Sequence, residues 1–212
     1  MRIWPIPLLL IATGLSPALE AQEPHFGVSL NLGFPTGDFR SKTYPATGPG
    51  TVTQTEGYDV GFGGQFTISF PVDPKVAIRM NLGGLVTDGT NTAAGFDRIN
   101  LRHQLYSVGG ELQVFPGTGS AYRHEGTYLL GGVSADFERF DRSFGTPNLD
   151  FTDSTRKSRL GGTLGIGHSF GYDAFGHFTL EGAFHKTLSG NHTSAGDPPS
   201  TDFAKLSLGW VF

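Results

Sequence analysis

The sequence contains no cysteine among its 212 residues. This absence excludes disulfide bonds, thiolate metal sites and a cysteine nucleophile at once. Runs of basic residues are missing too, and the formal net charge at pH 7 is -4. Proteins that bind nucleic acid normally carry a basic surface that meets the phosphate backbone. We therefore expect no nucleic-acid partner.

Long apolar segments are also scarce. No stretch reaches the roughly 18 consecutive apolar residues that a membrane-spanning helix requires. The hydrophobic fraction is 37%, which is low for a soluble protein that has to fill a core. Glycine is abundant, at 32 residues, and aromatic residues make up 12%. This combination suits β-strands with one small and one bulky face, so any membrane span must be built from strands.

Residues 1–21 have the layout of a secretory signal peptide. One positive charge precedes a short apolar run, and small residues lead to Ala18 and Ala21, either of which is a candidate cleavage point. The alternative is a buried N-terminal helix, which three prolines would interrupt: Pro5, Pro7 and Pro17. We expect the mature protein to be a single domain over residues 22–212.

The end of the chain, Ala204 to Phe212, alternates strictly between apolar and small or polar residues. Side chains point alternately to the two faces of a strand, so one face of this segment is apolar. A terminal aromatic ring fits a strand that ends at a membrane interface, where the ring packs against lipid and the carboxylate stays in water. The apolar face consists of Ala204, Leu206, Leu208, Trp210 and Phe212.

Seven further segments alternate in the same way, each about as long as a tilted strand that crosses the hydrocarbon layer. Long polar connections alternate with short ones along the chain. Outer-membrane barrels have an even strand number, short periplasmic turns and long external loops. The predicted strands are 25–34, 58–70, 75–86, 102–115, 127–137, 158–170, 177–188 and 204–212, and the predicted long loops are 35–57, 87–100, 140–157 and 189–202.

The predicted fold is therefore all-β: an eight-stranded antiparallel up-and-down transmembrane β-barrel with four long extracellular loops. The alternative is a soluble barrel of the lipocalin type, with apolar residues inside and polar residues outside. Many residues on the polar faces of the strands are Gly, Ser and Thr. A lipid-facing apolar side and a small, polar lumen therefore explain the sequence better.

At three places in the alternating pattern, the inward or outward direction of the side chains needs a separate prediction. Tyr58 is expected to point outward, into an aromatic belt near the outer interface. The stretch from Leu101 to Leu105 has apolar residues on the opposite parity, which suggests a β-bulge. In segment 127–137, Leu129 is expected outward, although Tyr128 favours the other parity.

The stretch from Gly27 to Phe39, G-V-S-L-N-L-G-F-P-T-G-D-F, together with the C-terminal L-x-L-x-W-x-F pattern, resembles the small outer-membrane β-barrel superfamily. This superfamily includes the membrane domain of outer-membrane protein A and its OmpX and OmpW relatives. The resemblance covers the mature chain and implies the bacterial outer membrane as its location. It also implies assembly by the outer-membrane insertion machinery, which recognises the terminal aromatic strand, here Leu206, Leu208, Trp210 and Phe212. It implies no activity.

Charged residues on the inward face need partners, because an unpaired buried ion costs several kcal/mol. We expect Arg79 to pair with Glu111 and Glu181 to pair with Lys205. His185 is expected near Lys205 or Ser207. An eight-stranded barrel has room only for its own side chains, so these residues are interpreted as a structural plug. The alternative is a narrow pore gated by rearranged ion pairs. The inward titratable residues are Asp59, Lys75, Arg79, Glu111, Asp136, Glu181, His185 and Lys205.

Catalysis is not expected. His168 and Ser169 are adjacent, so on a strand they point to opposite faces and cannot act as base and nucleophile. Ser169 is expected opposite Thr179, and His185 opposite Thr163, which separates that pair as well. The seven histidines show no ligand spacing, so neither a metal site nor a cofactor is expected.

The favoured function is that of a non-enzymatic monomer whose external loops contact the envelope surface, other cells or ligands. Outer-membrane lipid and lipopolysaccharide are its expected surroundings. Outward Arg139 and Lys186 are expected near the outer rim, where they snorkel or meet lipid phosphates. The alternatives are a narrow channel for small solutes, hydrophobic ones included, and a lipid-modifying enzyme.

Overall fold

The computed structural model describes residues 23–44, 54–93, 98–146, 149–172, 176–189 and 199–212. Within these ranges most residues are in strands, and the predicted signal peptide lies outside them. The elements are β1 (His25–Pro35), α2 (Gly37–Arg40), β2 (Lys42–Tyr44), β3 (Gln54–Tyr58), β4 (Gly61–Asp73), β5 (Val76–Ala93), β6 (Arg98–Val114), β7 (Gly126–Thr146), β8 (Leu149–Tyr172), β9 (Gly176–Thr187) and β10 (Phe203–Val211).

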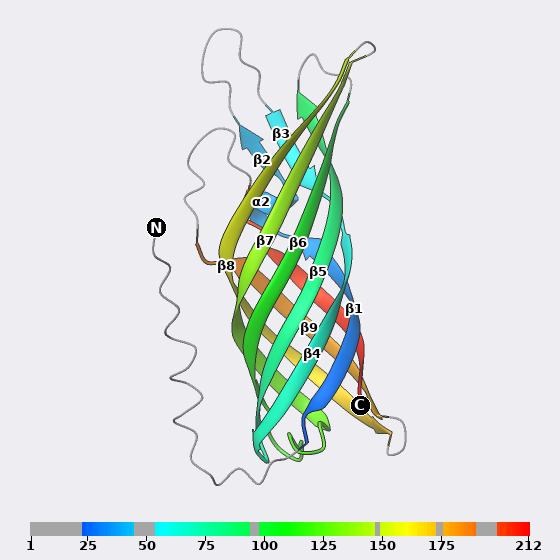
Figure 1. Ribbon diagram of the computed structural model, residues 1–212, viewed down its shortest axis with the longest axis vertical. Helices are drawn as coiled ribbons and strands as arrows, with labels where there is room; N and C mark the ends of the chain where they lie inside the picture. The colour runs from blue at the N-terminus through cyan, green and yellow to red at the C-terminus, as the bar shows by residue number, and fades with distance from the viewer. Residues whose placement is uncertain (1–22, 45–53, 94–97, 147–148, 173–175, 190–198) are drawn as a thin grey trace, which may run out of the picture.

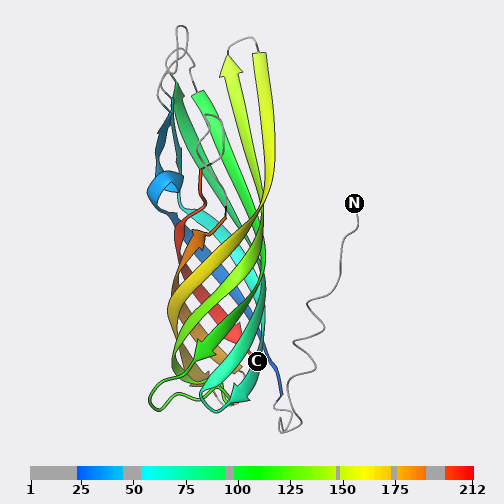
Figure 2. The same ribbon diagram turned by 90° about the vertical axis from the view of Figure 1, so that its left-hand side faces the viewer.

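Eight of the strands close into an antiparallel up-and-down barrel, which confirms the predicted fold class. The wall follows the chain order from β4 to β10, and β1 pairs with both β10 and β4 to close it. Figures 1 and 2 show the resulting tall cylinder of tilted strands. In the described part of the chain, no helix is long and apolar enough to cross a membrane.

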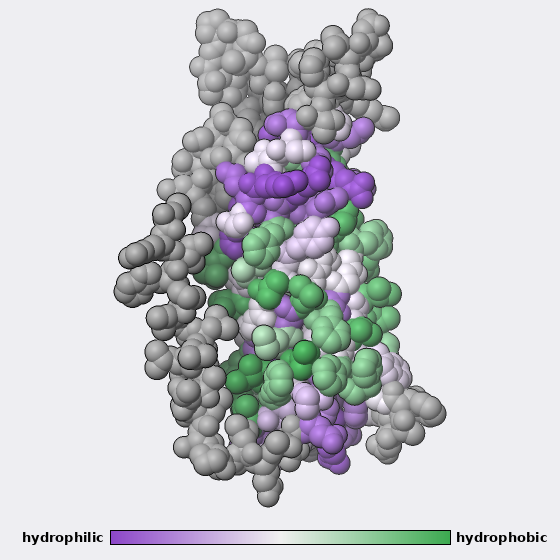
Figure 3. All heavy atoms as spheres, in the orientation of Figure 1, coloured by the Kyte–Doolittle hydropathy of each residue, from purple (hydrophilic) through white to green (hydrophobic). Residues whose placement is uncertain are grey.

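The wall is apolar on its outside and mostly polar inside. On β4, for example, Phe62, Phe66 and Phe70 are exposed, whereas Thr67 and Ser69 are buried. Figure 3 shows apolar side chains gathered in a band on the visible face, with hydrophilic residues above it. This arrangement fits a lipid-facing surface and is the reverse of the lipocalin-type alternative.

Both ends of the barrel sequence lie at the same end of the cylinder. Gly27 pairs with Val211, and Phe26 and Phe212 exchange two backbone hydrogen bonds of 2.9 and 2.8 Å. The short β4–β5 turn lies at this end as well. In outer-membrane barrels the termini and short turns face the periplasm, so this is named the periplasmic end and the opposite one the outer end.

Strands β5 to β8 continue well past β1, β4, β9 and β10 at the outer end (Figure 1). β7 and β8 stay paired up to Thr146 and Leu149, whereas β9 ends at Thr187. The predicted loops 87–100 and 140–157 are therefore wrong, since most of both ranges is paired strand. Sequence periodicity misses these extensions because a strand outside the lipid no longer needs an apolar outward face.

The predicted loop 35–57 also contains regular structure. It carries the short helix α2 and the strands β2 and β3, and β3 pairs with the outer part of β5. Gly37 opens α2 with φ +55°, a left-handed conformation that glycine adopts without strain. The described residues of the last predicted loop, 189 and 199–202, are not in strands.

A bulge between β3 and β4 reverses the facing predicted for two residues. Tyr58 pairs with Gly89 and Phe62 pairs with Val86, so β3–β4 holds one residue more than β5 between these pairs. As a result Tyr58 points inward and is 4% exposed, while Asp59 is exposed. Tyr58 therefore does not belong to the outer aromatic belt, and Asp59 is not a lumen residue.

The bulge predicted in β6 is absent. The register of β6 with β5 and β7 is continuous, and Leu101, His103 and Leu105 are buried on the same inward parity as Glu111. The lumen therefore becomes apolar toward the outer end without any change of parity. On β7, Leu129 faces outward as predicted.

Candidate functional site in the barrel lumen

The centre of the lumen holds a buried cluster of two cations and two carboxylates. Arg79 donates from Nε to Glu111 Oε2 at 2.7 Å. Its other nitrogens form a fork with Glu181, with Nη1–Oε2 at 2.7 Å and Nη2–Oε1 at 3.1 Å. Lys205 Nζ lies 3.9 Å from Glu181 Oε1 and donates to Gln65 Oε1 at 2.9 Å. The four charges balance, as buried ions require.

This cluster joins opposite walls of the barrel. Arg79 on β5 and Glu111 on β6 are direct cross-strand partners and form the first of the two ion pairs expected from the sequence. The second expected pair, Glu181 with Lys205, is also present. Glu181 comes from β9, which pairs with neither strand, so its contact with Arg79 spans the lumen. Tyr128 on β7 adds a hydrogen bond to Glu181 Oε2 at 3.1 Å. Sequence reasoning missed the spanning contact, although inward parity identifies each participant.

A second polar group lies toward the outer end. His185 Nε2 is 3.0 Å from Asp136 Oδ2, Ser134 donates to Asp136 Oδ1 at 2.8 Å, and Thr163 is 3.2 Å from His185 Nδ1. A Cβ on Gly161 would lie 2.2 Å from Asp136 Oδ2, so the glycine leaves room for this group. Asp136 and His185 were both expected inward, but not as partners.

Two expectations about individual lumen residues are wrong. His185 stands opposite Phe203 and stacks on its ring at 4.8 Å, so it is not beside Lys205, which pairs with Ala183. Lys75 is exposed at the periplasmic turn and donates to the carbonyls of Gly117 and Gly119 at 2.7 and 2.6 Å. With Asp59 also outside, the lumen network comprises Arg79, Glu111, Asp136, Glu181, His185 and Lys205, extended by Gln65 and Tyr128.

An aromatic cluster fills the lumen at its outer end. Phe39, carried by α2, stacks on Tyr58 at 4.7 Å and meets His103 edge-on at 5.0 Å. Phe140 lies 4.5 Å from the His103 ring, and Leu101 completes the cluster. Phe39 is fully buried, so the short helix places a ring into the mouth of the barrel.

The β6–β7 connection, residues 115–125, closes the periplasmic end. Phe115 and Ala121 are fully buried, and His124 is 1% exposed. The His124 ring packs edge-on against Phe115 and Tyr128, both at 5.6 Å. Burial lowers the pKa of His124 to about 3, so the ring is neutral at pH 7.

Between these two ends, two small cavities lie in the part of the lumen that the described residues form. One of about 40 Å³ is lined by Asn31, Gln65 and Lys205 among others, and one of about 20 Å³ lies beside Arg79 and His124. Each has space for no more than a few water molecules. In the described residues, side chains thus occupy most of the barrel axis.

The residues weighed for catalysis do not assemble into a reactive site. Ser169 faces inward opposite Thr179, and His185 stands opposite Thr163, both as predicted. His168 points to the other face and contacts Thr127 at 2.8 Å. Among the described residues, no group of three or more His, Asp or Glu side chains is placed to hold a metal ion.

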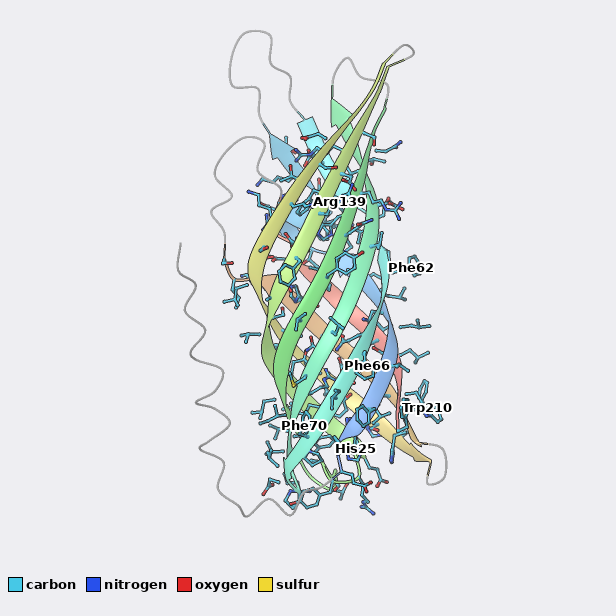
Figure 4. The ribbon with its side chains drawn as sticks, in the orientation of Figure 1. His25, Phe62, Phe66, Phe70, Arg139 and Trp210 are labelled. Atoms are coloured by element: carbon cyan, nitrogen blue, oxygen red, sulfur yellow. The ribbon has the colours of Figure 1, made fainter. Side chains whose placement is uncertain are left out.

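The terminal strand lies in the wall with its apolar side toward the lipid. Leu206, Leu208 and Phe212 are exposed on the outer surface, and Trp210 is partly exposed near the periplasmic end, as Figure 4 shows. The side chains of this strand are thus placed where the resemblance requires them. Their recognition by the insertion machinery stays a prediction.

A closed antiparallel barrel with an apolar outer band and a filled polar lumen defines a small β-barrel membrane protein. The sequence matches the family "Outer membrane protein beta-barrel domain" over residues 6–212. The chain therefore belongs to this family, whose membership implies the bacterial outer membrane. None of the curated proteins matches the sequence significantly.

Two solved structures share the fold. OprG from Pseudomonas aeruginosa is 12% identical, with a TM-score of 0.55, and the match covers 91% of this chain and 97% of that one. Ail, the attachment invasion locus protein of Yersinia pestis, solved with the heparin analogue sucrose octasulfate, is 14% identical with a TM-score of 0.51. That match covers 90% of this chain and 99% of Ail. Both likenesses concern the architecture.

Proposed function

We propose that this protein is a non-enzymatic, monomeric outer-membrane barrel that presents a β-sheet to partners outside the cell. Those partners are the envelope surface, other cells or ligands. The observation that carries the proposal is the continuation of β5 to β8 beyond the barrel wall, with β2 and β3 added beside β5. Ail, which is named for attachment, shares this architecture, so the fold is compatible with a surface role.

The protruding sheet has an open edge. β8 pairs with β9 only from Gly161 onward, where Gly161 faces Thr187. In the described part of the chain, the outer half of β8 therefore pairs with β7 alone. A strand edge offers free backbone donors and acceptors to an extended segment of a partner.

Ion pairs link the strands of the protruding sheet on its inner side. Arg142 on β7 lies 3.0 Å from Glu56 on β3, and Arg159 on β8 lies 3.2 Å from Glu138 on β7. These carboxylates are buried on the inner side of the sheet. A pre-organised surface loses less entropy on binding than a flexible loop would.

The test is to shorten the β7–β8 hairpin without touching the barrel. Asp141 and Ser154 are direct cross-strand partners, so residues 142–153 can be replaced by Asn-Gly, a two-residue hairpin turn. Because this removes Arg142, the same variant carries Glu56→Gln, so that no buried carboxylate loses its cation. We expect cells with the short hairpin to lose adhesion or ligand binding, while the barrel still shifts in electrophoresis on boiling. Unchanged binding by the shortened variant would contradict the proposal.

A narrow channel is the second candidate, favoured by the charged cluster that lies between two water-sized cavities. Rearrangement of Arg79 between its two carboxylates would have to open a path. Planar-bilayer recordings decide between the two functions. Steady single-channel steps that disappear in Glu111→Ala or Arg79→Ala would support the channel, and an absence of steps supports the plug.

The absence of enzymatic activity is part of the proposal. It is supported by the separation of His168 from Ser169 and by the burial of Ser169 beside a neutral His124, 3.4 Å away. Mass spectrometry of lipid A from cells that overproduce the protein provides the test. Altered acylation would establish a lipid-modifying enzyme instead.

A further inference from the structure

Polar side chains form two rows on the outer surface, just above the apolar band. The upper row runs across β5 to β8 and consists of Asp88, Arg102, Asp141 and Ser154, which are successive cross-strand partners. The lower row contains Gln104, Arg139 and Arg156. Figure 3 shows hydrophilic residues bounding the band, and Figure 4 places Arg139 above Phe62, Phe66 and Phe70 along the barrel axis.

Most charged side chains of the upper row are paired with an opposite charge of the protein itself. Arg102 lies 3.9 Å from Asp88, and both side chains are well exposed. Asp141 accepts hydrogen bonds from Arg139 at 2.9 Å and from Ser154. One carboxylate therefore already serves two donors, and little of its capacity remains for a further cation.

The lower row places two cations on neighbouring strands, and among the described residues Asp141 pairs with only one of them, Arg139. Arg139 and Arg156 are direct partners on β7 and β8, and both are exposed. Like charges directly opposite each other destabilise a sheet. An anion held between the two guanidinium groups would remove this repulsion, because guanidinium binds phosphate oxygens in a forked geometry.

Directly below this pair the surface becomes aromatic. Tyr106 and Phe137 are cross-strand partners one row nearer the membrane centre, with exposed fractions of 57% and 49%. Below them, Val133 and Leu160 continue the apolar surface. A ligand that fits both parts has a phosphate at one end and hydrocarbon chains at the other.

We propose that Arg139 and Arg156 bind the phosphate of a phosphorylated outer-leaflet lipid, whose acyl chains lie against Tyr106 and Phe137. Ser158, exposed opposite Phe137, supplies a hydroxyl at the same level. The site lies outside the lumen. It also lies below the hairpin segment whose removal tests the surface role, so the two proposals can fail separately.

The test measures lipid retention by native mass spectrometry of the mature chain in nanodiscs. The membranes contain phosphatidylcholine with either lipid A or lipid A freed of its phosphates. The variant Arg139→Gln/Arg156→Gln removes the pair. Arg102→Gln is the matched control, because Arg102 is exposed on the same outer face, one row further from the membrane, and is paired with Asp88.

We expect wild type and the Arg102 control to retain phosphorylated lipid A at least about tenfold better than the double variant, which corresponds to about 1.4 kcal/mol. The dephosphorylated lipid should bind all three proteins equally weakly. If the double variant does not fold, Arg156→Gln alone, which leaves the Arg139–Asp141 contact intact, should lower retention. The proposal would be overturned if wild type and the folded variants retained phosphorylated lipid A equally. It would also be overturned if wild type retained the phosphorylated and the dephosphorylated lipid equally.

Discussion

Replacing Arg79 by methionine should destabilise the barrel strongly, because the residue neutralises two buried carboxylates. Its guanidinium makes three hydrogen bonds of 2.7 to 3.1 Å to Glu111 and Glu181, and all three side chains are about 6% exposed or less. Removing one partner of a buried ion pair costs about 3 to 5 kcal/mol. After the change, Lys205 is the only cation left in the cluster to meet two carboxylates.

The free energy of unfolding can be measured by urea titration in lipid vesicles. Trp210 is the only tryptophan outside the predicted signal peptide and reports the transition by fluorescence. The matched control is Arg123→Ala, since Arg123 is 72% exposed and its pair with Glu125 should contribute no more than about 1 kcal/mol.

A second variant separates loss of charge balance from loss of packing. Arg79→Met/Glu111→Gln leaves Glu181 and Lys205 as one balanced pair. If uncompensated charge causes the instability, the double variant should be more stable than Arg79→Met by at least about 1 kcal/mol, although it lacks one more native charge. A loss in Arg79→Met no larger than in Arg123→Ala, or no recovery in the double variant, would refute the reasoning.

Three further outcomes are expected. Gly161→Ala places a methyl group 2.2 Å from Asp136 Oδ2 and should lower the free energy of unfolding by about 1 to 3 kcal/mol, whereas Gly182→Ala, which meets nothing within 4 Å, should have little effect. His124 stays neutral in the folded protein, whereas the unfolded chain takes up a proton at this residue below about pH 6.5. The free energy of unfolding should therefore fall as pH falls from about 6.5 toward 3. The variant His124→Asn, whose side chain tolerates the positive φ at this position, should show a weaker loss. Phe212→Ala keeps the backbone hydrogen bonds to Phe26 and should lower the amount of barrel in the outer membrane, measured by fractionation and immunoblotting. It should change the free energy of unfolding by no more than about 1 kcal/mol. Unchanged amounts would speak against a role of the ring in insertion.

The strands within the membrane could be predicted closely because lipid imposes a strict rule on each residue. The predicted strand 25–34 differs from β1 by one residue, and 177–188 differs from β9 by one at each end. The Arg79–Glu111 pair was predictable too, since each charge had to face inward and find a partner. Charged residues at inward positions of the strands therefore indicate a buried ion pair even where the sequence contains no known motif.

Contacts across the lumen could not be predicted in the same way. Whether Arg79 reaches Glu181 depends on the stagger of strands that are not neighbours, which is fixed only when the barrel closes. The facing of Asp59 depended on one additional residue between β3 and β4. A single bulge exchanges the inward and outward positions of all residues on one side of it. The alternation of apolar and polar residues from Tyr58 to Phe62 does not indicate that a bulge is present.

The strand β7 shows why the outer part of the sequence was difficult to interpret. Between Val133 and Phe137 its outward residues are apolar and its inward residues are polar, as at Asp136. Beyond Glu138, which is also buried inside, the chemistry has reversed without a change of parity: Arg139 is exposed outside and Phe140 is buried inside. This reversal marks the level at which the strand leaves the lipid and enters water, where an ordinary apolar core is favoured again. The aromatic cluster that closes the outer mouth and the arginine pair above the band are therefore two consequences of the same boundary.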